Sequence, residues 1–564
     1  MKKSIAVLLA LIIAFSLAST AFAANLPASY NAVEKGYVTS VKKQGDFGAC
    51  AAFSVVSCLE SDYIMQGYGT KDDTDFSEAY LYWFSANSGW SDKNSGYFGD
   101  GRIYNDDVVF QVGLNDLDIF ASLKTDSGIA YDRDFPYSPY LSRFMGHYSD
   151  IERVSSGCNV RIKDVVEFNV DDRASIKQWV LDHGGVSVMF YSNQYYHGDN
   201  GTVANNKLQL ISNHAVAIVG WDDDFTPEGK FSNLVMNGKK GAWLCKNSWG
   251  PEWGDGGYFW LPYSDPTIDA AIGVSVYVTD DCESKYSYNG YPVFYLGSEV
   301  SDKAANLFTA NQTGSITHTA FYVYPGTEIT VSIYKDAGDG NPESGGALAT
   351  FTGKYDHEGY YTEKLSSPVP VEKGEKFWVV GQYSTKAPLE LMSQYSHDEP
   401  GQTYVWLDGE WIETGDDPTA GNCPLDALIT AGSHTYGDTR HKDPTCDTVG
   451  YDMQTCVDCG RVVRTDVPAK GHSFGEWQEN GKIGSATLYT RKCSECGNID
   501  LMCKDKNGNI ISVEQATEDL SSDNSPAGFF ARLSDGFNSF FMTLRALVTT
   551  FYLRFISLFI PSYF

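Results

Sequence analysis

The sequence has little positive charge for its length. Its 564 residues include 42 Lys and Arg but 72 Asp and Glu, which gives a formal net charge of −30 at pH 7. Because nucleic-acid-binding proteins neutralise phosphates with Lys and Arg, this balance excludes nucleic acid as a partner. The hydrophobic fraction of 42% and the aromatic fraction of 14% are typical of a globular protein. A chain of this length is expected to form several separate cores.

Apolar runs long enough to span a membrane are also lacking at the two ends of the chain. At the N-terminus, Lys2 and Lys3 precede an apolar run from Ile5 to about Leu17, and Ala21-Phe22-Ala23 has the A-x-A pattern of a cleavage site. The run is too short to cross a bilayer, so a secretory signal peptide over residues 1–23 is favoured over an N-terminal anchor. The sequence therefore predicts a secreted, extracellular or cell-surface protein with bacterial-type export.

The twelve cysteines do not have the spacing of a disulfide framework, although the chain is predicted to be exported. Six are scattered between Cys50 and Cys423, whereas the other six crowd between Cys446 and Cys503. This distribution indicates two populations with two different roles.

The first part of the chain mixes patterns of helices and strands. Helices are predicted over Cys50–Ile64 and over Ser175–His183, where His183-Gly184-Gly185 ends the second one. Buried strands are predicted over 185–191, 213–220 and 241–246. An α+β domain is expected here.

Cys50 stands at the first turn of the first predicted helix. Backbone N–H groups and the helix dipole stabilise a thiolate at that position, whereas a cysteine inside an apolar stretch is more often core filler. Gln44, just before the turn, is placed to offer its amide to an oxyanion. His214 at a strand start is a candidate base, Asn247 can orient the imidazole, and the indole of Trp249 can shield that hydrogen bond. Taken alone, His214 and the segment around Asn247 also fit purely structural roles.

Together, the segments QGDFGACAAF, SNHAVAIVGW and KNSWGPEWGDGGYFWL resemble the papain family of cysteine peptidases over about 250 residues. The resemblance implies that Gln44 is the oxyanion donor, Cys50 the nucleophile, His214 the general base and acid, and Asn247 the orienter. It further implies that Trp249 shields the site. No cofactor is implied for catalysis.

A weaker correspondence places Gly113 where the family has a glycine that lets the substrate backbone approach. Phe47 stands where the family usually has a disulfide-bonded cysteine, and Ala51 replaces a bulky aromatic residue. The signal peptide leads almost directly into the mature start. We therefore expect an enzyme that is competent on export, without a removable N-terminal pro-domain.

Downstream of residue 281 the pattern changes to short alternating strands. The clearest signal is a hairpin, with Tyr404–Leu407 and Glu410–Ile412 flanking the turn residues Asp408-Gly409. A β-sandwich is predicted, and it resembles the lectin-like domains that follow some prokaryotic papain-family peptidases. A glycan or another surface ligand is the expected partner. The acidic loop 336–343 is interpreted as a hairpin turn rather than as a calcium site.

The cysteine-rich region contains two CxxCG motifs, at Cys456–Cys459 and at Cys493–Cys496, within one and a half copies of a repeat. Such a motif directs two thiolates toward one metal ion. The predicted tetrahedral structural zinc site consists of Cys446, Cys456, Cys459 and His472. Disulfides in an oxidising exterior remain the alternative.

The C-terminal tail is predicted to form an amphipathic helix. Its apolar residues from Phe529 to Phe559 form one stripe, with Arg545 and Arg554 on the flanks, and no apolar run reaches 18 residues. A helix lying in the membrane surface is favoured over a spanning helix and over packing against a partner.

The expected architecture is therefore multidomain. An α+β papain-like peptidase with helical and β subdomains is followed by an all-β sandwich, a zinc-ribbon-like unit and an amphipathic helix. The predicted boundaries are 1–23 for the signal peptide, 24–281 for the peptidase, 282–432 for the lectin-like sandwich, 433–504 for the cysteine- and histidine-rich unit, 505–526 for an acidic linker and 527–564 for the tail.

The predicted function is hydrolysis of protein or peptide amide bonds by a secreted cysteine endopeptidase. A surface-binding protein on an inactive papain-like scaffold is the non-enzymatic alternative. Aminopeptidase or amidase action is the enzymatic one, if an insertion closes one end of the cleft.

Overall fold

The computed structural model describes most of residues 26–511. The described residues are 26–45, 47–86, 119, 123, 128–137, 159–192, 201–203, 205, 212–226, 239–279, 283–288, 295–297, 301–390, 399–415, 421–446, 450–457, 462–483 and 485–511. The predicted signal peptide, the tail 527–564, Gly113 and Cys459 lie outside them. Within the described part of the chain, no helix is both long enough and apolar enough to cross a membrane.

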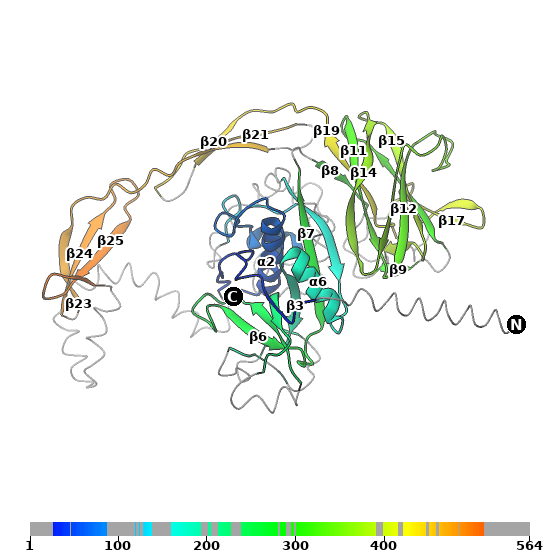
Figure 1. The fold of residues 1–564 in the computed structure, drawn as a ribbon. Coiled ribbons are helices and arrows are strands. Elements are labelled where there is room, and N and C mark those ends of the chain that lie inside the picture. The colour runs from blue at the N-terminus through cyan, green and yellow to red at the C-terminus, as the bar shows by residue number, and fades with distance from the viewer. Residues whose placement is uncertain are drawn as a thin grey trace, which may run out of the picture. The chain divides into compact units, whose positions relative to one another are not determined.

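The peptidase-like domain contains one helix that is buried on nearly all sides. This helix, α2 (Cys50–Met65), has Ala51, Ala52, Val55, Val56 and Leu59 in its core-facing turns and packs against the sheet behind it (Figure 1). Its buried residues lie on nearly all sides and include polar ones such as Glu60 and Asp62, so α2 is a core helix and not an amphipathic surface helix. The helix predicted over 50–64 is confirmed.

Two further helices flank α2. Helix α3 (Glu78–Ala86) contacts α2, and helix α6 (Arg173–His183) covers the sheet. The Asp172 side chain accepts a hydrogen bond from the Ser175 N–H and caps α6. Gly184 ends the helix with φ 85°, a conformation that glycine adopts without strain. This confirms the end that was predicted at His183-Gly184.

Antiparallel strands form the β part of this domain, in the order β6-β5-β4-β3-β7-β2, with β1 paired to β4. The three predicted strands appear as β3, β4 and β5. The bounds are β1 (Ser29–Asn31), β2 (Val160–Glu167), β3 (Val186–Phe190), β4 (His214–Asp222), β5 (Ala242–Lys246), β6 (Tyr258–Pro262) and β7 (Ala270–Val278).

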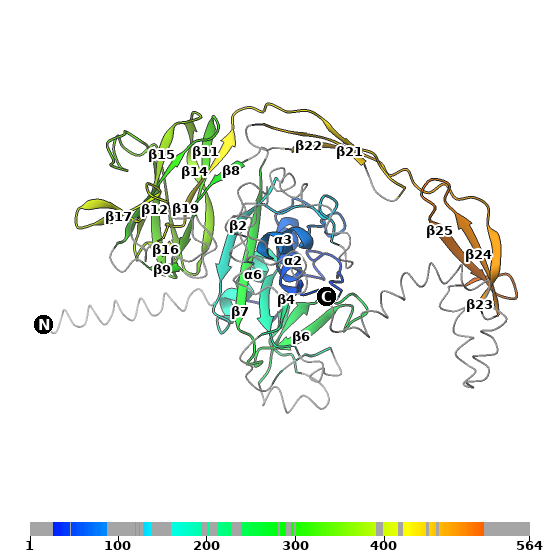
Figure 2. The same ribbon diagram turned by 180° about the vertical axis from the view of Figure 1, so that it is seen from behind.

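The same sheet continues into the following domain. Strand β2 pairs with β14, so that Val165 lies opposite Tyr360, and the order then runs through β11 and β19 to β8 (Figure 2). Gly359 sits where an added Cβ would lie 2.6 Å from the Val165 carbonyl oxygen, so the close approach of the strands requires glycine. The bounds are β8 (Glu283–Tyr286), β11 (Gly314–Val323), β14 (Glu358–Val371) and β19 (Leu425–Ala431).

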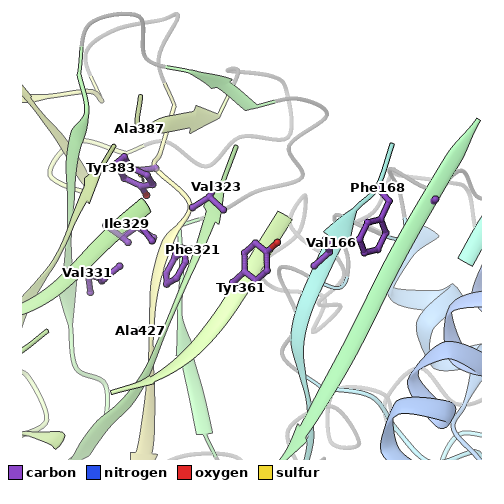
Figure 3. Packing of buried hydrophobic residues seen from close by; sticks show 14 of the residues in the cluster. Val166, Phe168, Phe321, Val323, Ile329, Val331, Tyr361, Tyr383, Ala387 and Ala427 are labelled. Carbon is purple, nitrogen blue, oxygen red and sulfur yellow. Dashed lines mark hydrogen bonds between the residues drawn. The ribbon is translucent and has the colours of Figure 1, made fainter. Parts of the chain in front are cut away.

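A second, six-stranded sheet packs on β11, β14 and β19. Phe321 and Tyr361 from one side and Ile329 and Val331 from the other belong to a single buried cluster (Figure 3). The sheet order is β13-β12-β15-β10-β17-β18, and β9 and β16 form a separate pair. The bounds are β9 (Tyr295–Gly297), β10 (Lys303–Thr309), β12 (Thr327–Lys335), β13 (Ala349–Tyr355), β15 (Lys376–Tyr383), β16 (Pro388–Glu390), β17 (Thr403–Leu407) and β18 (Glu410–Glu413).

The hairpin predicted around Asp408-Gly409 is confirmed. Strands β17 and β18 pair across these two residues, which have φ 51° and 93°. Positive φ at both central positions is the requirement of the tight turns that join twisted antiparallel strands.

The cysteine-rich region, mainly residues 438–454 and 464–511, forms a second compact unit. It contains a three-stranded sheet in the order β20-β21-β22 and a four-stranded sheet in the order β23-β24-β25-β26. The bounds are β20 (Arg440–Lys442), β21 (Gly450–Thr455), β22 (Val462–Val467), β23 (Gln478–Ile483), β24 (Ala486–Lys492), β25 (Ile499–Lys504) and β26 (Ile510–Ile511).

Candidate active site

Cys50 is the first residue of α2 and is only 8% exposed. Burial raises the pKa of its thiol, while the backbone N–H groups of Ala215 and Ala51 act in the opposite direction by hydrogen bonding to the sulfur. Ala215 directly follows His214 in β4, so this contact brings the nucleophile candidate beside the imidazole-bearing strand. The first turn of α2 also supplies N–H groups that have no partner within the helix.

His214 is the first residue of β4 and is held by Asn247, which directly follows β5. This contact distinguishes the two ring nitrogens, because Nε2 lies 2.8 Å from the Asn247 Oδ1. The Ser248 N–H also donates to that oxygen at 2.8 Å, which fixes the amide with its carbonyl toward the ring. Nε2 therefore donates its proton to Asn247, and Nδ1 is left to accept a proton from a thiol.

Burial lowers the pKa of His214 to about 4, and the hydrogen bond that the ring donates to Asn247 acts against that shift. Burial also raises the pKa of Cys50. Both pKa shifts arise because burial disfavours the charged form of each group when that charge stands alone. When a proton moves from the thiol to the imidazole, however, two opposite charges appear side by side, and their attraction offsets the penalty.

One indole lies against the imidazole, and a second indole packs behind the first. The Trp249 ring stacks on His214 with centroids 4.6 Å apart and planes tilted by 27°. Trp253 packs edge-on against Trp249 at 5.0 Å. The stacked ring covers one face of the imidazole, which is the position expected from the sequence for a shielding indole.

Gln44 is fixed by Ser248, which the sequence analysis did not single out. The Gln44 N–H donates to the Ser248 carbonyl at 2.8 Å, and the Ser248 hydroxyl donates to Gln44 Oε1 at 2.5 Å. The Gln44 Nε2 donates to the Phe47 carbonyl at 2.6 Å. A primary amide carries two N–H hydrogens, and this contact uses one of them, which leaves the other for an oxyanion.

A buried group of charges lies behind the site, and sequence reasoning missed it. The Lys42 ammonium contacts Glu60 at 3.0 Å and Glu78 at 2.7 Å. Thr39 donates to Glu60 at 2.5 Å, and the Lys246 ammonium donates to Thr39 at 2.9 Å. Glu60 is on α2 and Lys246 directly precedes Asn247, so this group links the helix that carries Cys50 to the strand that positions Asn247.

The electrostatics of this group follow from burial. Burial lowers the pKa of Lys246 to about 8, and it raises the pKa of Glu78 against the opposing effect of Lys42. Burial would also lower the pKa of Lys42, but Glu60, Glu78 and Asp75 outweigh it and raise that pKa. No local pattern marks these residues, because their partners are 18 to 207 positions apart in the chain.

The predicted metal ligands are only partly brought together. Cys446 and His472 do lie side by side, but their companions are Cys493 and Cys496, and the four ligand atoms lie within 4.8 Å of one another. Cys456 is not part of this group. The prediction combined cysteines that are neighbours in sequence, whereas the fold brings a distant CxxC motif to Cys446.

Comparisons with known proteins agree with this geometry. The papain family of cysteine proteases matches residues 26–107 and 111–276, and the family described as a lectin-like domain matches residues 285–427. Among curated proteins, vignain of Ricinus communis is 30% identical over 254 residues, covering 44% of this chain and 59% of vignain. Cathepsin F of Drosophila melanogaster is 26% identical over 258 residues, covering 44% of this chain and 35% of that protein. The chain thus spans about a third to three fifths of these relatives.

One solved structure covers both domains. It contains the cysteine protease and lectin-like domains of Cwp84, a surface layer associated protein of Clostridium difficile. The TM-score is 0.59 at 24% identity, over 72% of this chain and 90% of the other. The likeness supports the fold of two consecutive domains. Residues 26–107 and 111–276 of this chain thus match the papain family of cysteine proteases, and residues 285–427, which follow them, match the lectin-like domain family.

Proposed function

We propose that the protein is a cysteine peptidase that hydrolyses protein or peptide amide bonds at Cys50. Two contacts of one strand carry the proposal. His214 donates a buried hydrogen bond to Asn247, and the next residue, Ala215, donates its N–H to the Cys50 sulfur. This arrangement leaves the imidazole nitrogen that does not face Asn247 for the thiol proton.

The first half of the reaction forms an acyl-enzyme. The Cys50 sulfur attacks the carbonyl carbon of the scissile amide while its proton passes to His214 Nδ1. Negative charge develops on the carbonyl oxygen, where the remaining Gln44 Nε2–H and the Cys50 backbone N–H donate hydrogen bonds. The C–N bond then breaks, and the leaving amine takes the proton from His214.

The second half releases the acid product. His214 removes a proton from water, and the resulting hydroxide attacks the thioester carbon. The C–S bond breaks as the same two donors stabilise the second oxyanion, and the thiolate regains its proton from the imidazolium. Asn247 holds the ring in one tautomer throughout, and no metal or cofactor takes part.

Digestion of a peptide library, read by mass spectrometry, tests this proposal and distinguishes its variants. The mature chain is compared with Cys50→Ala, in which hydrolysis should fall on the order of 10⁶-fold, the size of loss found when a hydrolase nucleophile is removed. Internal cuts that vanish in the variant would establish an endopeptidase. Trimming from the N-terminal end alone would indicate an aminopeptidase, and no Cys50-dependent product from the folded, reduced protein would support the binding-protein alternative.

Secretion and surface association are part of the proposal. They are supported by the signal-peptide pattern of residues 1–23 and by the structural likeness to a surface layer associated protein. Fractionation of cells that produce the chain should find residue 24 or its neighbour as the mature N-terminus in the extracellular or surface fraction. Retention of the intact chain inside the cell would contradict it.

The lectin-like domain is proposed to bind a glycan through an aromatic pair on its outer sheet. The rings of Trp406, on β17, and Trp411, on β18, have centroids 5.4 Å apart, and Trp406 is 36% exposed. The Lys303 ammonium lies 5.8 and 5.5 Å from these two centroids and pairs with Glu343 at 2.6 Å. Ring faces attract the C–H groups of a sugar, and the adjacent charged groups offer hydrogen bonds to hydroxyls.

Binding to an array of surface glycans tests this second activity. The Cys50→Ala chain should bind at least one glycan, and Trp406→Ala should weaken that binding by about tenfold or more, the loss expected for an exposed aromatic contact. Tyr68→Ala, a change at an exposed aromatic residue of the peptidase domain, is the matched control and should leave binding unchanged. Equal binding by all three proteins would place the ligand elsewhere.

A further inference from the structure

Four metal-binding side chains converge in the cysteine-rich unit from three separate segments. Cys446 lies between β20 and β21, and His472 follows β22. Cys493 and Cys496 lie in the turn between β24 and β25. The segments are therefore distant in sequence, and only the fold brings their ligand atoms within 4.8 Å of one another.

The distances within the cluster have the size of a zinc tetrahedron. The Cys446 and Cys493 sulfurs are 3.8 Å apart, and the Cys496 sulfur lies 3.4 Å from His472 Nδ1. With Zn–S near 2.3 Å and Zn–N near 2.0–2.1 Å, tetrahedral angles give edges of about 3.8 Å between two sulfurs and about 3.6 Å between sulfur and nitrogen. A disulfide would need sulfurs about 2.05 Å apart, so the cluster is not arranged as a cystine.

The turn that carries two of the ligands is shaped to present both to one ion. The Gly497 N–H donates to the Cys493 carbonyl at 3.0 Å, and the Cys493 N–H donates to the Asn498 carbonyl at 2.8 Å. Gly497 has φ 76°, which explains the glycine that follows the CxxC motif. This tight turn keeps the two thiols on the same side of the backbone.

Backbone pairing places the other two ligands beside each other. The Gly471 N–H donates to the Cys446 carbonyl at 3.1 Å, and the Lys470 N–H donates to the Thr445 carbonyl at 2.8 Å. The residue after Gly471 is His472, so its ring is delivered next to Cys446 by main-chain hydrogen bonds. The arrangement does not depend on a chance approach of side chains.

The described residues of this unit also form only a small apolar core. In its four-stranded sheet, the described core consists of three buried residues, Ala486, Leu488 and Cys503, with Ile483 and Ile511 packed against them. Ile499, Leu501 and Ile510 are exposed. Small domains of this kind usually rely on a metal ion or disulfides.

We infer that Cys446, His472, Cys493 and Cys496 bind one structural Zn²⁺ that fastens the β20–β21 loop to the β24–β25 turn. Three soft thiolate donors and one imidazole suit Zn²⁺ and exclude Ca²⁺ and Mg²⁺, which require oxygen ligands. The site is independent of peptide hydrolysis at Cys50.

Metal analysis of the full mature chain tests the site. The protein carries Cys50→Ala to prevent self-digestion, is purified with a mild reductant, and is measured for zinc by mass spectrometry. Cys446→Ser and Cys493→Ser should each lose one zinc per chain relative to the parent. Cys456→Ser is the matched control, because it removes a buried cysteine of the other CxxC motif, and it should leave that zinc in place.

Loss of zinc through misfolding alone is distinguished by Cys496→His. Histidine is also a zinc ligand, so this variant should retain the zinc that Cys496→Ser loses. In the Co²⁺-substituted parent, thiolate-to-metal charge-transfer absorption should weaken by about one third in Cys496→His, as one of three thiolates is replaced. The inference is overturned if Cys446→Ser and Cys493→Ser keep the parent's zinc, or if the parent holds no zinc and its cluster cysteines are disulfide-bonded.

Discussion

The two cysteine-bearing regions of the molecule position their thiols by different means. In the peptidase domain, Cys50 is held by a helix that is almost fully enclosed, and its partners His214 and Asn247 are fixed by neighbouring strands. Among the described residues of the cysteine-rich unit, few apolar side chains are buried, and Cys446, Cys493 and His472 lie together at the ends of short strands.

The comparison teaches why the same residue type serves two chemistries. A thiol enclosed by a core next to one imidazole can be activated as a nucleophile, because the surrounding packing fixes its geometry without using its electrons. Thiols that converge from exposed loops, with little packing around them, are free to share a metal ion, whose bonds then supply the missing stability.

Removal of the Lys42 ammonium, which pairs with two buried carboxylates behind the active site, is expected to have the largest effect on stability. Lys42→Met leaves Glu60 and Glu78 buried without their common partner, and breaking a buried ion pair in this way costs about 3–5 kcal/mol. The free energy of unfolding of the peptidase domain, measured by urea denaturation, should fall by this amount.

The matched control is Lys240→Met, because Lys240 pairs with Asp224 on the surface, where a salt bridge contributes about 0–1 kcal/mol. Equal stability of the two variants would show that the charge group does not hold α2 to β5. The view that buried contacts fix the geometry of the peptidase site would then be wrong for this charge group.

The oxyanion donor is expected to matter for the rate and less for substrate binding. Gln44→Ala removes one donor and should lower kcat by about 10²–10³-fold with little change in KM. Ser248→Ala removes only the hydrogen bond that orients the Gln44 side chain and should have a smaller effect in the same direction. Steady-state kinetics of both variants measure this, and a larger loss in Ser248→Ala than in Gln44→Ala would contradict the assignment.

The pH dependence should show the burial of the imidazole. Since burial lowers the pKa of His214 to about 4, a second proton enters the thiol–imidazole pair only at low pH. The acid limb of kcat/KM should therefore fall as the pH drops through about 4, provided that the protein stays folded, which circular dichroism checks at each pH.

Asn247→Ala tests the direction in which the acid limb of kcat/KM moves. The hydrogen bond that His214 donates to Asn247 raises the pKa of His214 against the effect of burial, so its loss should move the acid limb to still lower pH. The rate should also fall by roughly 10²-fold, because the ring is no longer held in one tautomer. A shift of the limb to higher pH would show that Asn247 does not act on the imidazole in this way.

Much of the peptidase site was predictable from sequence because its signals are local. The helix beginning at Cys50, the strand beginning at His214 and the Asn247 segment each carry their own pattern, and their order along the chain resembles one family. The hairpin at Asp408-Gly409 was likewise encoded by its two turn residues.

The remainder depended on contacts between distant segments. Lys42 and Glu60 were not singled out from the sequence, because nothing local shows that Glu60 is buried beside Lys42 and Lys246. Similarly, the pairing of β2 with β14 joins two domains that the sequence presents as separate. Cys446 was grouped with its nearest CxxC motif. In the structure, the Gly471 N–H donates to the Cys446 carbonyl and the Ser494 N–H donates to the Ser473 carbonyl, and these two contacts bring Cys446 to the following motif.

Labelling with a peptidyl vinyl sulfone, followed by peptide mapping, tests the division between the two kinds of cysteine most directly. The account predicts one adduct per chain on Cys50, complete loss of peptide hydrolysis, and modification of Cys446, Cys493 and Cys496 by a small alkylating agent only after a strong zinc chelator is added. A chain that is labelled at other cysteines while Cys50 stays unmodified, or that continues to hydrolyse peptides after full labelling of Cys50, would contradict it.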